Sequence, residues 1–123
     1  MKIILAIGLG SSIGGMLRYV LAESIQQKLQ STLPFGTFTI NVIGCFLIGI
    51  VFGLFDRGNL SQEWRLFLAT GLLGGFTTFS AFSMETVNLL RDGQYGSVMT
   101  YVAGSVVIGL LATFAGISIT KIF

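Results

Sequence analysis

The sequence predicts an all-α membrane protein in which residues 1–123 form a single domain of four transmembrane helices. Of the 123 residues, 53% are hydrophobic and only 10% are charged, which is typical of chains that cross a lipid bilayer. The charges are clustered and leave four uncharged runs, at residues 3–17, 29–55, 66–84 and 93–120. A span needs roughly 20 apolar residues. Each run can therefore cross once, the first only if Arg18 is embedded.

The first helix is expected over residues 3–27. Small residues at Gly8, Ser11 and Gly15 recur near the helical spacing, which favours close packing against another helix in a membrane. Arg18 is expected at the interface or half buried, because a cation in a span must reach water or a polar partner. Glu23 follows five residues later, a spacing that does not guarantee a tight pair with Arg18 within one helix.

The second helix is expected over residues 35–55, directly after Pro34. A stripe of small and polar residues recurs at every fourth position: Thr37, Asn41, Cys45, Gly49 and Gly53. The amide of Asn41 is costly in hydrocarbon unless it is hydrogen-bonded, so this side chain should face protein or a cavity. It either joins two helices or donates N–H groups to an anion.

The third helix is expected over residues 64–90, starting at the interfacial Trp64, with a break between Gly74 and Thr78. Two adjacent glycines weaken a helix, and the hydroxyls of Thr77 and Thr78 can serve freed backbone groups or a bound ion. Broken helices at membrane depth often expose carbonyls and amides to ions. The segment is therefore a candidate ion site.

Aromatic residues follow this segment at every third position, so Phe76, Phe79 and Phe82 are expected on one helical face. The positive edges of Phe79 and Phe82 could point at an anion, or the three rings could simply make lipid and packing contacts. Glu85 lies three residues after Phe82 on the same face. An ionisable residue so close to a span is a candidate functional group, although Glu85 is near the helix end.

The fourth helix is expected over residues 97–119, with another stripe at every fourth position: Tyr101, Ser105, Gly109 and Thr113. This stripe either lines a polar path or packs against a neighbouring helix.

Four spans place both termini on one side of the membrane. The cations on that side are Lys2, Arg57, Arg65 and Lys121, and those on the other are Lys28 and Arg91. This weak bias predicts insertion in both orientations. The small size predicts an oligomer.

The polar inventory favours transport of a small ion over catalysis. The chain has no histidine, no nucleotide-binding loop and no nucleophile–base pair, so we do not expect an enzyme. It has no basic cluster for nucleic acid. Amides, hydroxyls and aromatic edges suit a small anion, although periodicity alone selects neither fluoride nor even an anion. A small dual-topology proton-coupled multidrug or cation antiporter that uses Glu85, or a membrane scaffold, are the alternatives.

Three motifs resemble one family over essentially the whole chain. They are GGMLRY at residues 14–19, GTFTINVIG at 36–44 and GLLGGFTTFSAFS at 71–83, and they are similar to the Fluc (CrcB) fluoride channels of microbes. The third motif is the most specific of the three. Ala81 differs mildly, because many members of the family carry Ser or Thr there.

The resemblance implies an antiparallel, dual-topology homodimer in the bacterial inner (plasma) membrane. Its two pores would passively export cytoplasmic fluoride that entered as HF, which reduces fluoride toxicity. The residues implied to line the pore are Asn41, Phe79, Phe82, Ser80, Thr78, Tyr101 and Ser105. Carbonyls of Gly74 and Thr77 from both subunits would hold a structural sodium ion at the dimer centre. Arg18 would sit at a vestibule or brace it, and Glu85 would lie near the pore.

Overall fold

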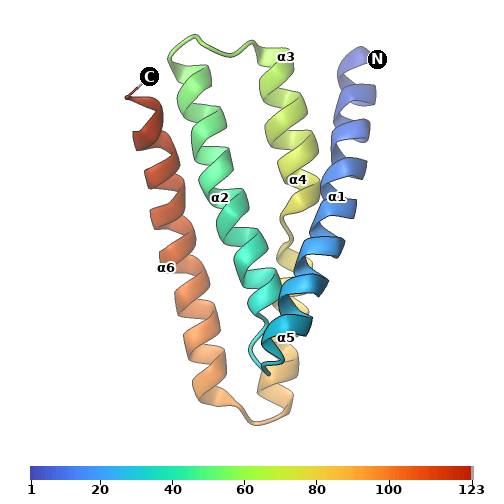
Figure 1. Ribbon diagram of the computed structural model, residues 1–123, viewed down its shortest axis with the longest axis vertical. Helices are drawn as coiled ribbons and strands as arrows, with labels where there is room; N and C mark the ends of the chain where they lie inside the picture. The colour runs from blue at the N-terminus through green and yellow to red at the C-terminus, as the bar shows by residue number, and fades with distance from the viewer. Residues whose placement is uncertain (123) are drawn as a thin grey trace.

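A computed structural model describes residues 1–122, in which the chain forms a bundle of four membrane-length helical spans without a β-strand (Figure 1). Three spans are continuous helices: α1 (Lys2–Leu29), α2 (Phe35–Asp56) and α6 (Tyr95–Thr120). The remaining span, Gln62–Arg91, consists of four pieces: α3 (Gln62–Arg65), the π-helix η1 (Leu66–Leu73), α4 (Gly74–Phe76) and α5 (Phe79–Arg91). All four spans are long and apolar enough to cross a bilayer, which confirms the predicted number and order.

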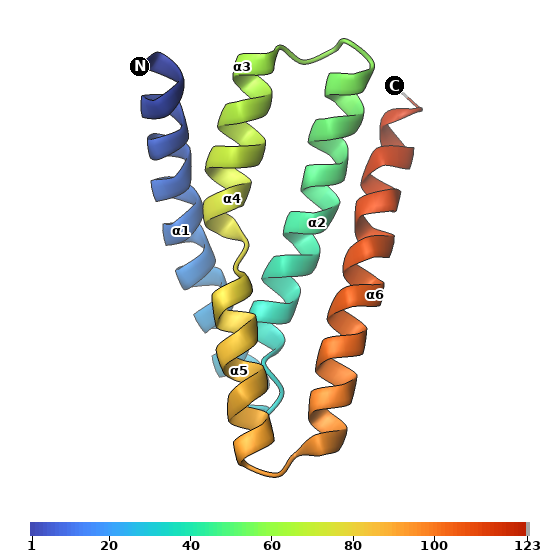
Figure 2. The ribbon, with the colours of Figure 1, turned by 180° about the vertical axis from the view of Figure 1, so that it is seen from behind.

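Both chain termini lie at one end of the bundle, beside the loop that joins α2 to α3 (Figures 1 and 2). The loops from α1 to α2 and from α5 to α6 lie at the opposite end. This arrangement follows from an even number of spans. In both views α6 runs beside α2, and α1 runs beside the third span.

Glycines let α2 and α6 touch backbone to backbone. A Cβ atom on Gly116 of α6 would collide with the carbonyl oxygen of Phe46, and one on Gly49 of α2 would collide with the carbonyl oxygen of Thr113. No larger side chain fits between the two helices at this crossing. Membrane helices commonly associate through small residues of this kind, because close approach maximises van der Waals contact without a hydrophobic driving force.

The third span is broken, as predicted, but the break lies at the threonines rather than at the glycine pair. Thr77 and Thr78 are extended, with φ/ψ of −89°/157° and −149°/122°, whereas Gly74 and Gly75 keep helical geometry. Gly75 serves a different purpose, because a Cβ atom there would collide with the carbonyl oxygen of Ser11 in α1. The glycine allows α1 to approach closely, and the following threonines leave the helix.

Alanine substitutions in α6 test whether a glycine is needed for the close contact with α2, apart from the effect of alanine on helix propensity. We expect Gly116→Ala to lower the free energy of unfolding by roughly 1–3 kcal/mol, because the added methyl overpacks the contact with α2. Gly104→Ala in the same helix is the control, since the nearest atom to its Cβ would be 3.9 Å away. Thermal unfolding in detergent measures both variants. A Gly116→Ala protein as stable as Gly104→Ala would contradict the packing argument.

Candidate functional site

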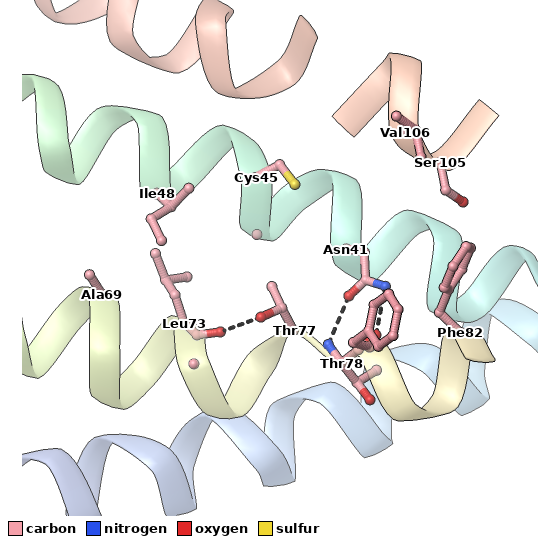
Figure 3. Close-up of a pocket in the computed structure, with 13 residues that line it drawn as sticks. Asn41, Cys45, Ile48, Ala69, Leu73, Thr77, Thr78, Phe82, Ser105 and Val106 are labelled. Atoms are coloured by element: carbon pink, nitrogen blue, oxygen red, sulfur yellow. Dashed lines mark hydrogen bonds between the residues drawn. The ribbon is translucent and has the colours of Figure 1, made fainter. Parts of the chain in front are cut away.

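The side chain of Asn41 in α2 holds the break in the third span (Figure 3). Its Nδ2 donates to the carbonyl oxygen of Thr78 at 3.0 Å, and its Oδ1 accepts from the N–H of Thr78 at 2.9 Å. The N–H and the hydroxyl of Thr77 both donate to the carbonyl oxygen of Leu73, each at 2.9 Å. The N–H groups of Thr77 and Thr78 and the carbonyl of Thr78 therefore have protein partners, as extended backbone at membrane depth requires.

At the break, two backbone N–H groups donate to side chains instead of to the carbonyls that they would meet in a continuous helix. In a continuous helix the N–H of Thr78 would donate to the carbonyl of Gly74, and that of Ala81 to the carbonyl of Thr77. Here the N–H of Thr78 donates to Asn41, and the N–H of Ala81 donates to the hydroxyl of Thr78 at 3.2 Å. The carbonyls of Gly74 and Thr77 thus have the chemistry of cation ligands in unwound membrane helices. Within residues 1–122 no cluster of three or more His, Cys, Asp or Glu could hold a metal instead.

An open pocket of about 380 Å³ lies against the break. Its lining residues come from α2, the third span and α6: Asn41, Gly44, Cys45, Ile48, Ala69, Leu73, Gly74, Thr77, Thr78, Phe79, Phe82, Ser105 and Val106. The lining carries no formal charge. Five predicted pore residues, Asn41, Thr78, Phe79, Phe82 and Ser105, and both predicted carbonyl ligands are therefore brought together.

Ser105 presents an unsatisfied hydroxyl to this pocket. Its Oγ is buried and has no hydrogen-bond partner among the described residues. Figure 3 shows the side chain reaching from α6 toward Phe82. A buried hydroxyl without a partner costs about 1–3 kcal/mol. The hydroxyl is therefore free to donate a hydrogen bond into the pocket.

The sequence predicts Phe76, Phe79 and Phe82 on one helical face, but only Phe79 and Phe82 lie together in the structure, and Phe76 lies apart from them. Phe76 is 6% exposed, whereas Phe79 is 78% exposed and lines the open pocket. The extended residues between them rotate α5 relative to α4, so the three-residue spacing no longer aligns Phe76 with the two rings of α5. Phe82 lies between two other rings, with its centroid 5.7 Å from that of Phe79 and 5.0 Å from that of Tyr101.

Glu85 joins three helices at the end of this aromatic series. Its Oε1 accepts from the hydroxyl of Tyr101 in α6 at 3.0 Å, and its Oε2 accepts from the hydroxyl of Thr37 in α2 at 2.8 Å. Glu85 also lines a second pocket, of about 340 Å³, which lies among the ends of α1, α2 and α5. Because Phe82 lines the first pocket and touches Tyr101, this Thr37–Glu85–Tyr101 cluster lies between the two pockets.

Thr37 is the site residue that sequence reasoning missed. The sequence marks it as an embedded polar residue and as the first member of the stripe that contains Asn41, but not as a site residue. That stripe was a usable signal, because residues four apart lie on the same helical face. Ser80 was predicted and lies at the edge of the site: its hydroxyl oxygen is 3.3 Å from that of Thr78, but the side chain is exposed and does not line either pocket.

Arg18 is half buried, as predicted, and braces the third span rather than the pocket. Its Nε donates to the carbonyl oxygen of Gly75 at 3.2 Å, two residues before the extended segment. About two turns earlier in α1, the hydroxyl of Ser11 donates to the carbonyl oxygen of Gly71 at 3.3 Å. These two bonds attach α1 to the helical part of the third span that precedes the break, and Arg18 is not among the residues that line the pocket.

Comparison with known proteins identifies the family. The family model of CrcB-like protein, Camphor Resistance (CrcB), matches residues 5–117. The fluoride-specific ion channel FluC of Phocaeicola vulgatus is 47% identical over 117 residues, which cover 95% of this chain and 97% of the relative. The proteins of the same name from Flavobacterium psychrophilum and Thermus thermophilus are 44% and 46% identical, covering 98% and 91% of this chain and 98% and 88% of the relatives. With a match of this length and identity, the chain belongs to the CrcB-like family.

Proposed function

We propose that this protein is a channel of the bacterial inner membrane through which fluoride leaves the cytoplasm down its electrochemical gradient. The observation that carries the proposal is the buried, unpaired hydroxyl of Ser105 in an uncharged pocket that also contains an amide and aromatic rings. Neutral donors of this kind can replace part of the hydration shell of a small anion. The relatives named as fluoride-specific ion channels support this choice of ion. No catalytic step is needed, so the protein is not an enzyme.

Asn41 and Ser105 are the proposed donors to fluoride. Thr78 engages one amide hydrogen of Asn41, and no described residue engages the other. The rings of Phe79 and Phe82 would offer their positive edges to the ion. The hydroxyls of Thr78, Ser80 and Tyr101 would border its path, and Tyr101 leads to the Thr37–Glu85–Tyr101 cluster and the second pocket. Arg18 would act indirectly, by bracing the helix before the break.

The proposed working form is an antiparallel homodimer of copies inserted in opposite orientations. Two observations support it: the pocket is open on one side with the 78% exposed Phe79 at its rim, and the cations are distributed with little bias between the two ends. A second copy would cover Phe79 and enclose the ion path, which one open pocket does not do. This arrangement would place two such pockets in one dimer.

A structural sodium ion at the dimer centre fits the oxygens that the break supplies. The carbonyls of Gly74 and Thr77 would hold it, because the N–H groups of Thr78 and Ala81 are directed to side chains instead. Backbone carbonyls in unwound membrane helices are typical ligands for such an ion. Its chemistry there would be electrostatic, since a buried cation stabilises an anion nearby in a low-dielectric region.

Fluoride efflux from liposomes tests the proposal. Purified protein is reconstituted with internal fluoride, valinomycin supplies the potassium counter-flux, and an electrode records fluoride outside, with chloride as the control ion. We expect rapid fluoride efflux, negligible chloride efflux and no need for a proton gradient. A transport activity that required a proton gradient and disappeared in Glu85→Gln would instead support the antiporter, which the relatives' names do not favour.

A further inference from the structure

Gln26 ties the end of α1 to the loop and helix that follow it. Its Nε2 donates to the carbonyl oxygens of Ser31 at 2.8 Å and Leu33 at 3.1 Å, and its Oε1 accepts from the N–H of Gly36 at 3.0 Å. One half-buried side chain thus binds two loop carbonyls and the first turn of α2. This is the largest set of hydrogen bonds to the backbone made by a single side chain among those described.

The bond to Gly36 supplies something that α2 lacks. The first N–H groups of a helix have no partner within the helix, and the residue that precedes α2, Pro34, provides no side-chain cap. Gln26 provides the acceptor from the neighbouring helix. Gly36 also packs directly on α1, because a Cβ atom there would collide with the carbonyl oxygen of Ala22. The start of α2 is therefore positioned by α1 through two independent contacts.

The next residue of α2 is Thr37, whose hydroxyl donates to Glu85 at 2.8 Å. A hydrogen bond weakens steeply once its distance or angle departs from the ideal range, so a small shift of the first turn of α2 would weaken this one. Gln26 and Glu85 also line the same 340 Å³ pocket. A displacement of Gln26 would therefore move Thr37 and disturb the Thr37–Glu85–Tyr101 cluster between the two pockets.

We propose that Gln26 is a positioning residue for ion passage, which holds the start of α2 where Thr37 can donate to Glu85. This inference rests on the proposed function in one respect only: it takes the Thr37–Glu85–Tyr101 cluster to lie on the path of the ion. Gln26 itself acts through Thr37 and the loop backbone, and it does not bind the ion. Its amide suits this task because it combines two donors for the carbonyls of Ser31 and Leu33 with an acceptor for Gly36.

Carboxyl NMR tests the positioning without requiring transport. The chain contains three glutamates, so ¹³C labelling of the carboxyl groups gives few signals, and Glu85→Gln identifies that of Glu85. We expect Gln26→Met, which has similar length but no amide, to shift the Glu85 signal in the same direction as Thr37→Val. Gln27→Met is the matched control, because Gln27 is adjacent and exposed. An unchanged Glu85 signal in Gln26→Met, or in Gln26→Asn if the Met variant does not fold, overturns the proposal.

A double-mutant cycle tests the consequence for transport. We expect Gln26→Met to slow fluoride efflux about fivefold or more, and to slow it less than about twofold when Thr37→Val is already present, because coupled residues are not additive. Equal losses in both backgrounds would mean that Gln26 acts independently of Thr37 and would overturn the proposal. Absence of fluoride efflux from the unmodified protein would refute the proposed function instead, and the NMR comparison would still decide the role of Gln26.

Discussion

Replacement of Asn41 with aspartate is expected to nearly abolish fluoride efflux. The carboxylate would still accept the N–H of Thr78, but it could not donate to the carbonyl of Thr78 or to an ion. It would also place a negative charge in an uncharged pocket. Two like charges about 4 Å apart repel by about 4 kcal/mol at an effective dielectric constant of about 20, which corresponds to a roughly thousandfold loss of flux.

The liposome efflux assay measures this loss. Asn59→Asp is the matched control, because it makes the same chemical change at an exposed position in the loop between α2 and α3. The control should conduct like the unmodified protein. An Asn41→Asp protein with undiminished fluoride efflux would show that the ion does not pass this amide, and it would move the path away from the break.

Phe82→Ile is expected to reduce fluoride efflux by roughly tenfold, with the protein still assembled. Phe82 lines the pocket and contacts the rings of both Phe79 and Tyr101. An isoleucine has comparable bulk but no positive ring edge to offer an anion, and it removes both ring contacts. Because Tyr101 donates to Glu85, loss of the contact would also loosen the Thr37–Glu85–Tyr101 cluster.

Efflux and size-exclusion chromatography together test this expectation. Phe114→Ile is the control, since Phe114 is 66% exposed on α6 and lines neither pocket. Phe79→Ile should behave like Phe82→Ile, although its ring has fewer contacts within one chain. Normal fluoride efflux in both pocket variants would contradict a mechanism based on aromatic edges.

The four spans could be predicted because the signal for them is local. The predicted helices at residues 3–27, 35–55, 64–90 and 97–119 differ from the observed ends by at most two residues, since the charged and loop-forming residues mark those ends. Asn41 was singled out for a similar reason: an amide in an apolar run has to find a partner whatever the fold. That its partner would be the backbone of Thr78 could not be predicted, because it depends on how α2 meets the third span.

The contacts beyond the break were not predictable from periodicity. Two extended residues change the rotation of α5 relative to α4, so a helical wheel drawn through both misplaced Phe76 relative to Phe79. The same rotation determines that Glu85 meets Thr37, and no spacing within one helix encodes that pair. The bond from Arg18 to Gly75 likewise depends on how closely α1 approaches the third span, which glycine alone permits but does not specify.

The position of both termini at one end of the bundle limits which gene fusions could join two copies in opposite orientations. Duplication followed by direct end-to-end fusion would join two units whose first spans enter the membrane in the same direction. An inverted pair within one polypeptide would need an odd number of additional spans between the units. For a protein whose proposed assembly is inverted, separate chains are thus the simplest genetic solution, and a single gene would supply both orientations.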